Sequence, residues 1–332
     1  MPRTEAAFVL GVVCTETRPE RRAWLRSFYA KHPGILVRFV LSDDWLARQP
    51  GRPASDEVGV PVTREPGAHC VDKSFGWWRI ARRWPAAFYG KTDDDALIDP
   101  VGLLPLLTRM PREQCAAGTL GYTSIRLPTL EAGCWARGAA GALRLKRQSC
   151  RSTDFGPYPF ASGPLELLSS DVVAWLAPRL RSVRGQRCQW EDRLVGLALT
   201  DRANLTLVNL WRAVGNMNVV TTRGKWLGAD AFVAHWVRSP NRFSRVIEEL
   251  ASARREYASD VGCGAGGACS NDTAAWSCRP LADELAGRGG GFPCCDGWTQ
   301  CAVPGRWRGS GAVTRAGRLS WAEWEARRAL VH

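Results

Sequence analysis

Three adjacent carboxylates follow a short apolar stretch, in the run Lys91-Thr92-Asp93-Asp94-Asp95. Neighbouring carboxylates repel one another and lose hydration energy unless a cation compensates them, and hard oxygen ligands suit Mg²⁺ or Mn²⁺. Because side chains alternate along an extended strand, Asp93 and Asp95 would approach one ion while Asp94 points elsewhere. An exposed acidic turn that needs no metal is the alternative explanation of the triplet.

A second acidic pair, Glu191-Asp192, opens a stretch that is predicted to be helical as far as Leu199. Acids in a first helical turn are stabilised by the helix dipole, which is one explanation of the pair. The other is a carboxylate that accepts a proton from a substrate. The dipole would lower the pKa of such a base and burial would raise it, and only a raised pKa helps proton removal near neutral pH.

The elements that would position these acids alternate between strand and helix, which predicts an α/β fold. Strands are expected at 8–13, 35–41, 58–62, 87–91, 115–125, 206–212 and 231–237, and helices at 19–30, 73–84, 100–108, 171–180, 191–199 and 240–257. Residues 159–169 are expected to be loop followed by strand. Open α/β sheets bind ligands at the carboxyl ends of their strands, where the Asp triplet lies. Thr15, just past the first strand, has a comparable position.

The chain divides by composition into two parts. Residues 1–258 carry the alternating elements, with a basic, Gly-containing loop expected at 133–151. Residues 259–332 are rich in Cys and Gly and are predicted to form a cross-linked appendage. Six of the 12 cysteines fall between Cys263 and Cys301 without the CxxC spacing of a zinc site. Disulfides in an oxidising compartment are the simplest explanation.

The sequons, the apolar stretches and the net charge of the chain bear on its location and partners. Two sequons, at Asn204 and Asn271, are compatible with a secretory route. No stretch approaches the length of a membrane span, so membrane attachment is expected only through an anchor absent from this chain. The formal charge of +13 favours an anionic partner such as a nucleotide, a polyanionic glycan or an acidic membrane. Arginines are scattered and no nucleic-acid-binding motif is present, so no nucleic acid is expected as a partner.

Four ordered motifs resemble glycosyltransferase family 31, the β-1,3-galactosyltransferase-like enzymes that include the Fringe-related proteins. The motifs are Glu20 to Tyr29, similar to Arg-Arg-x-x-Ile-Arg-x-Thr-Trp; Lys73 with its Trp-bearing helix and then 91–95, similar to Leu-Lys-Thr and Lys-x-Asp-x-Asp; Tyr158 to Asp171, similar to Tyr-Pro-x-Tyr-x-Ser-Gly-x-Gly-Tyr-x-x-Ser; and Trp190 to Gly196, similar to Glu-Asp-Val-x-x-Gly. Together they cover roughly residues 5 to 250. Each motif is short, and their order and spacing carry the resemblance.

The resemblance implies a GT-A-type, Rossmann-like nucleotide-sugar transferase fold with a mixed central sheet and helices on both faces. It implies an inverting, metal-dependent hexosyltransferase that moves galactose or N-acetylglucosamine from a UDP-sugar to a glycan or glycoprotein in β-1,3 linkage. Mn²⁺ or Mg²⁺ would be the cofactor, and the Golgi lumen the location, as a membrane-anchored enzyme. A catalytically silent relative that binds glycans is the alternative.

The resemblance also assigns roles to single residues. Asp93, Asp95 and a late histidine, His235, would hold the metal, although a lone strand histidine is as readily explained by packing. Asp192 matches the family's general base, with Glu191 as the second choice. Contacts to the donor are expected from Thr15, Arg22, Arg26, Lys73 and Asp94, because cationic groups neutralise a diphosphate well. Taken singly, each of these cations could equally be a solvated surface charge.

Two departures from the family pattern limit what can be carried over. Gly163-Pro164-Leu165 stands where the family has Gly-x-Gly, and the segment between Ser42 and Asp72 lacks the family's Asp-Phe and Asn-Leu-Thr elements. The donor sugar and the acceptor therefore stay open.

Overall fold

A computed structural model describes most of the first 260 residues and one short segment near the end of the chain. The described residues are 6–63, 69–108, 110–126, 131–139, 142–143, 154–180, 191–199, 202, 205–210, 213–216, 227, 231–260 and 300–302. Within these ranges, no helix combines the length and the apolar composition that crossing a bilayer would need.

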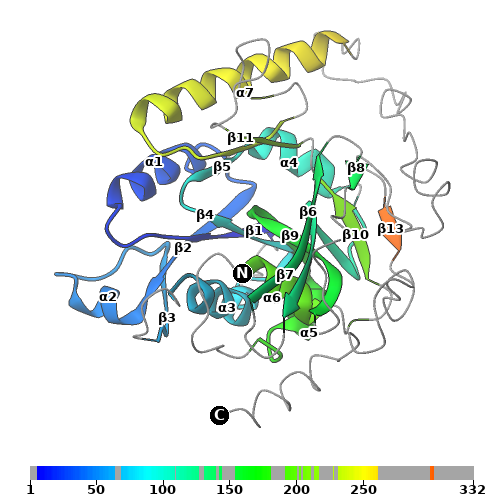
Figure 1. Ribbon diagram of the computed structural model, residues 1–332. Coiled ribbons are helices and arrows are strands. Elements are labelled where there is room, and N and C mark those ends of the chain that lie inside the picture. Colours follow the sequence, from blue (N-terminus) through cyan, green and yellow to red (C-terminus); the bar gives the residue numbers. More distant parts are fainter. Residues whose placement is uncertain are drawn as a thin grey trace.

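The N-terminal part alternates strands and helices and begins with the strand, helix and strand that the sequence predicts (Figure 1). Its elements are β1 (Ala6–Val13), α1 (Pro19–Tyr29), β2 (Ile35–Ser42), α2 (Asp43–Arg48), β3 (Glu57–Val60), α3 (His69–Ile80), the 3₁₀ turn η1 (Ala81–Arg83) and β4 (Ala86–Asp93). Strand β1 is central and pairs in parallel with both β2 and β4. This register places the carboxyl ends of β1 and β4 side by side, with Val13 opposite Asp93.

The remaining elements extend this sheet and cover it. They are β5 (Ala96–Ile98), α4 (Pro100–Leu107), β6 (Cys115–Arg126), β7 (Glu131–Ala139), β8 (Ala142–Leu143), β9 (Asp154–Ser169), α5 (Ser170–Leu176), α6 (Glu191–Leu199), β10 (Thr206–Asn209), β11 (Val214–Asn216), β12 (Val233–His235), α7 (Pro240–Asp260) and β13 (Gln300–Ala302). The strand order along the main sheet is β13-β10-β6-β9-β4-β1-β2-β3.

The central sheet is mixed. Strands β3, β2, β1 and β4 are parallel, and β9 then runs antiparallel to both β4 and β6. Strand β10 pairs in parallel with β6. The predicted α/β class, with a mixed sheet and a Rossmann-like arrangement, is confirmed at this level.

Helices cover both faces of the sheet, and each face has its own apolar core (Figure 1). Strand β1 shows why, since Phe8 and Leu10 pack with α1, α4 and α7, whereas Val9 packs with α3, α5 and α6. Alternate residues of a strand point to opposite faces, so a strand buried on both sides is a continuous apolar run. The predicted placement of helices on both faces is therefore confirmed.

Close packing against α3 depends on a glycine in β1. A Cβ on Gly11 would lie 2.3 Å from the ring of Trp77, so only glycine lets this indole approach the strand. Trp77 is fully buried and its indole N–H donates to the carbonyl of Gly90 at 2.9 Å. The Trp-bearing helix predicted from Lys73 is thus anchored directly to the two strands that lead to the candidate site.

A second, small sheet lies beside the end of β4. Strand β12 pairs antiparallel with β5 and parallel with β11. In this register His235 lies opposite Ala96, the residue that follows the Asp triplet. Residues that are about 140 positions apart in the sequence are therefore neighbours.

Two predictions about secondary structure are wrong. Part of the stretch predicted as a loop at 133–151 is strand, because β7 pairs with β6 and β8 pairs with β7. Residues 159–169, predicted as loop followed by strand, belong entirely to the long strand β9. Cross-strand pairing overrides the weak strand propensity of Gly-rich and basic segments.

The C-terminal part is described only at residues 300–302, which form β13 and pair antiparallel with β10. The rest of the predicted appendage beyond α7, including the cysteines at 263, 269, 278, 294 and 295, lies outside the described residues. Among the cysteines that are described, Cys70 is disulfide-bonded and Cys14 and Cys115 are free.

Candidate active site

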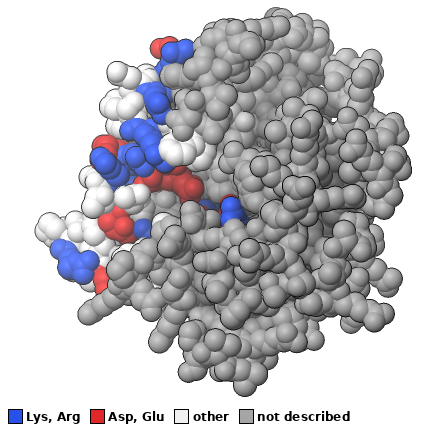
Figure 2. Space-filling model, in the orientation of Figure 1, with Lys and Arg blue, Asp and Glu red and all other residues white. Residues whose placement is uncertain are grey.

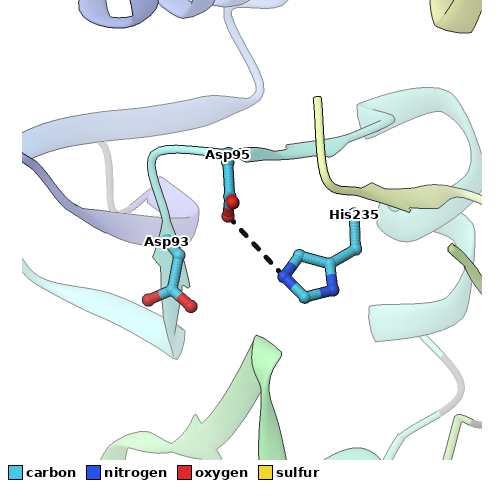
Figure 3. A group of neighbouring side chains, drawn as sticks. All are labelled: Asp93, Asp95 and His235. Carbon is cyan, nitrogen blue, oxygen red and sulfur yellow. Dashed lines mark ion pairs between the residues drawn. The ribbon is translucent and has the colours of Figure 1, made fainter. Parts of the chain in front are cut away.

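Asp93, Asp95 and His235 form a group with the composition of a metal site (Figure 3). One ligand atom from each residue lies within 4.8 Å of the others. Asp93 ends β4, Asp95 follows the bend after it, and His235 ends β12 with its ring pointing toward the carboxylates. We call these three residues the ligand triad. Two carboxylate oxygens and an imidazole nitrogen suit Mn²⁺ or Mg²⁺.

Each aspartate of the triad pairs with a protein cation through one oxygen. Lys91 Nζ lies 3.0 Å from Asp93 Oδ1, and Arg238 Nε donates to Asp95 Oδ2 at 2.7 Å. Asp95 Oδ1 lies 3.6 Å from His235 Nε2. The two carboxylates are thus fixed in orientation, and one oxygen of each remains for a metal ion.

The protonation state of His235 also suits a ligand. Burial lowers the pKa of its imidazole, against the opposing effect of the Asp95 and Asp93 charges. A neutral imidazole offers a nitrogen lone pair to a metal, whereas an imidazolium does not. The residues present therefore fit a divalent cation, in agreement with the prediction from the sequence.

Asp94 points away from the triad, as strand alternation predicts. Its Oδ2 accepts the backbone N–H of Thr15 at 2.6 Å, and its Oδ1 pairs with Arg21 Nη1 at 2.8 Å. Asp94 and Thr15 were expected to contact the donor. Their contact with each other fixes the loop after β1 against the end of β4, and their contact with the donor stays a prediction.

The cations of α1 that were expected to contact the donor already have acidic partners. Arg26 makes two hydrogen bonds to Asp56, at 2.7 and 2.9 Å. Arg22 is buried, lies 3.5 Å from Glu57 and stacks on the ring of Trp45. Both residues connect α1 to the loop and strand on the far side of β2, and their contact with the donor stays a prediction.

Lys73 lies nearer to the end of β1. Its buried Nζ donates to the carbonyl of Cys14 at 2.6 Å and to both oxygens of Glu16 at 3.0 Å. Burial raises the pKa of Glu16, but the charge and hydrogen bonds of Lys73, together with backbone hydrogen bonds, outweigh it and the net pKa is lowered. Lys73 is therefore committed to Glu16, a residue to which the sequence gave no role.

Charged side chains on the visible described surface are mixed in sign. Figure 2 shows Lys and Arg side chains interspersed with Asp and Glu side chains over the described part of this face. The net positive charge of the chain does not gather there into one basic patch of the kind that binds nucleic acid.

The second acidic region surrounds Lys91, which is fully buried. Its Nζ donates to Glu191 Oε1 at 2.9 Å and lies 3.4 Å from Glu166 Oε1, in addition to its contact with Asp93. We call Lys91, Glu166, Glu191 and Asp192 the lysine cluster. Burial lowers the pKa of Lys91, but the charges of Asp93, Glu191 and Glu166 outweigh it and raise the pKa well above its usual value. Lys91 therefore stays charged and joins the two acidic regions.

Glu166 is the most deeply buried acid of the lysine cluster. It is 1% exposed, and neither carboxylate oxygen has a hydrogen-bond partner within the described part of the chain. Burial raises the pKa of Glu166 to about 8, against the lowering effect of Lys91. A buried acid with a pKa in this range is largely protonated at neutral pH.

Glu191 and Asp192, at the start of α6, differ in their partners. Glu191 is held by Lys91, while Asp192 Oδ1 accepts only the neighbouring backbone N–H of Arg193, at 2.7 Å, among the hydrogen bonds of the described residues. Burial first, and then the charge of Glu191, raise the pKa of Asp192 to about 7. Burial thus outweighs the helix dipole, which is the condition that proton removal near neutral pH requires.

The backbone opposite these acids is open because of Gly163. A Cβ at this position would lie 3.1 Å from Asp93 Oδ2, 3.7 Å from Lys91 Nζ and 3.9 Å from Glu191 Oε1. Strand β9 therefore approaches the ligand triad and the lysine cluster at the same point, and a side chain there would crowd both.

No protein-family model matches this chain, and no curated protein does. The resemblance to glycosyltransferase family 31 therefore stays a prediction from the four sequence motifs.

Three residues of the site were not predicted from the sequence as functional. Lys91 is part of the motif at 91–95 but was given no role. Its position two residues before Asp93, on the same side of β4, could have indicated that the two side chains are close. Glu166 interrupts the apolar run Leu165 to Leu168, and a charge inside a buried strand indicates a paired or protonated group. Arg238 had no local signal, because it reaches Asp95 only through the pairing of β12 with β5.

Proposed function

We propose that this chain is an inverting, metal-dependent glycosyltransferase of the GT-A type, which transfers a hexose from a UDP-sugar to a glycan or glycoprotein. One observation carries the proposal: the ligand triad and the Glu191-Asp192 pair, which lie in separate parts of the sequence, meet through Lys91. A cation site and a desolvated carboxylate side by side are the two groups that direct displacement at a sugar carbon needs.

The triad would hold Mn²⁺ or Mg²⁺. A bound divalent ion supplies positive charge that neutralises the diphosphate of the donor. Asp93 and Asp95 would contribute the oxygens that face away from Lys91 and Arg238, and His235 would contribute Nε2. These are roles of this chain's own side chains and require no movement of the strands that carry them.

Asp192 would act as the general base. The hydroxyl oxygen of the acceptor forms a bond to the anomeric carbon while the bond from that carbon to the UDP oxygen breaks. The hydroxyl proton passes to Asp192, and the electron pair of the broken bond leaves with UDP. With a pKa of about 7, Asp192 is partly ionised at neutral pH and still basic enough to accept the proton. Glu191 is bonded to Lys91 and is better suited to positioning than to proton transfer.

The finer features of the proposal follow from the motifs. They favour galactose or N-acetylglucosamine as the transferred sugar, a β-1,3 linkage, and a membrane-anchored enzyme of the Golgi lumen. The disulfide at Cys70 is in keeping with an oxidising compartment.

A donor screen tests the proposal. The chain is incubated with Mn²⁺ and single UDP-sugars, with and without a mixture of glycan acceptors, and release of UDP is measured. Consumption of one donor that depends on Mn²⁺ supports the proposal. Absence of any Mn²⁺-dependent affinity for UDP contradicts it. Binding of UDP without turnover on any acceptor favours a catalytically silent, glycan-binding relative.

A further inference from the structure

Arg238 lies beside the ligand triad and has one side open to solvent. Its Nε donates to Asp95 Oδ2 at 2.7 Å, yet its side chain is 46% exposed while that of Asp95 is 9% exposed. The ion pair with Asp95 therefore uses only part of the guanidinium of Arg238. The exposed part of Arg238 therefore faces the space outside the triad.

The guanidinium of Arg238 is held by stacking as well as by its ion pair. Its central carbon lies 3.5 Å from the centroid of the Trp236 ring. Trp236 has a φ of 70°, a conformation that a bulky residue adopts only when its surroundings impose it. The carbonyl of Trp236 accepts Nη1 of Arg242 at 3.1 Å, and the N–H of Val237 donates to the carbonyl of Asp95 at 2.8 Å.

These contacts fix the plane of the guanidinium before any ligand arrives. Because Nε is used by Asp95, the terminal nitrogens are left to bind something else, and no hydrogen bond from them is found among the described residues. A planar pair of N–H groups with a fixed orientation matches two oxygens of a phosphate group. Pre-organisation of this kind lowers the entropy lost on binding.

The other cations near the site have no such freedom. Lys91 is fully buried among carboxylates, Lys73 is bonded to Glu16, and Arg21 to Asp94. None of them combines contact with a triad residue and an exposed donor group. Arg238 does.

We infer that Arg238 binds the diphosphate of a nucleoside diphosphate, on the phosphate that approaches the ligand triad. The inference rests on the proposed function and adds to it a second, protein-borne positive charge beside the metal. It also explains why Asp95 has two roles, since one oxygen faces the metal position and the other orients Arg238. The competing explanation is that Arg238 only holds Asp95 in place for the metal.

The two explanations are separated by calorimetric titration of the full-length chain with Mn²⁺ alone, and with UDP or UMP at saturating Mn²⁺. The variants are Arg238→Gln, Arg238→Lys and Arg245→Gln. Arg245 is the matched control, because its side chain is 48% exposed and its Nε bonds to a carboxylate, Glu249, at 3.1 Å. Thermal melting of each variant checks that it is folded.

In the wild-type chain UDP is expected to bind more tightly than UMP. Arg238→Gln should weaken UDP binding by about ten- to a hundredfold, the range expected for losing charge-assisted hydrogen bonds, and should change Mn²⁺ affinity by less than about twofold. Arg238→Lys should recover part of the loss, because it restores the charge without the paired N–H geometry. Arg245→Gln should match the wild type.

Unchanged UDP affinity in Arg238→Gln overturns the inference. So does an equal loss of affinity for Mn²⁺ alone, which would show that Arg238 acts only by holding Asp95. A wild-type chain that shows no Mn²⁺-dependent UDP binding contradicts the proposed function itself and this inference with it. The result that contradicts the proposed function therefore differs from the results that contradict only the role of Arg238.

Discussion

The ligand triad and the lysine cluster use the same chemical group in two different surroundings. In the triad, the carboxylates of Asp93 and Asp95 each keep one oxygen on a cation, and Asp93 is 34% exposed. In the lysine cluster, Glu166 is 2% exposed by its side chain and Asp192 has a pKa raised to about 7 by burial and by Glu191. The ligand triad, which includes the more exposed carboxylate of Asp93, is therefore suited to holding a cation. The lysine cluster, whose carboxylates are desolvated, is suited to accepting a proton.

The largest effect is expected from a substitution that removes one residue of the ligand triad. Asp95→Ala removes a metal ligand and also releases Arg238, so turnover should fall roughly a thousandfold or more, because a divalent ion contributes several kcal/mol of charge stabilisation. Mn²⁺-dependent UDP binding, measured by calorimetry, should be lost as well. Asp44→Ala, an exposed acid on α2, serves as the control. Retention of metal-dependent UDP binding in Asp95→Ala would show that the triad is an ion-pair network without a metal.

The second prediction separates the two regions. Asp192→Asn removes the proton acceptor and leaves the triad intact, so kcat should fall about 10²- to 10⁴-fold while the affinity for UDP with Mn²⁺ stays within about twofold. Steady-state kinetics and calorimetry on the same preparation measure both. Turnover near the wild-type rate would refute the assignment of the base and direct attention to Glu191.

The third prediction concerns Lys91, the residue that joins the ligand triad to the lysine cluster. Lys91→Met leaves Glu191 buried without its cation, which should lower the free energy of unfolding by about 3–5 kcal/mol. Chemical denaturation monitored by fluorescence measures the change. Lys31→Met, at an exposed lysine, should stay within about 0.5 kcal/mol of the wild type. If both variants were equally stable, Lys91 would not hold the two regions together.

The smallest expected effect is a shift in the pH dependence of catalysis, which tests how Glu191 changes the pKa of Asp192. Asp192 must be ionised to accept a proton, so kcat/KM should rise with pH and level off above about 7, the pKa of Asp192. The charge of Glu191 contributes to that raised pKa, after burial. Glu191→Gln should therefore move the inflection of the pH–rate profile to lower pH. An inflection that stays in place or moves upward would contradict the coupling between the two acids.

Local sequence was sufficient for much of the α/β framework. Apolar runs such as 8–13 and the helix from Lys73 were predicted because a buried strand and an amphipathic helix have characteristic periods. The opposite directions of Asp93 and Asp94 followed from the same period of two in a strand. Strands β7 and β8 were missed, because their residues have little strand propensity of their own and form strands only through the pairing of β7 with β6 and of β8 with β7.

The acidic partners of the cations near the candidate donor site were not predicted from the sequence. Arg26 and Lys73 were expected to contact a diphosphate, which stays a prediction, and their partners within the chain are Asp56 and Glu16. A long cationic side chain can reach several acids, and only the packing of α1 and α3 against the sheet decides which acid is nearest. Acidic groups at a strand end have shorter side chains, so their position follows more directly from the backbone.

The sequence by itself determined which residues could do chemistry: the Asp triplet at the end of an apolar strand, the acidic pair that opens a helix, and the order of the motifs. The tertiary structure decided which of them act together. His235 and Arg238 meet Asp95 through the pairing of β12 with β5, and Lys91 meets Glu191 across 100 positions of sequence. Contacts of this kind, and the burial that raises the pKa of Asp192, arise only when distant segments pack together, and no local pattern records them.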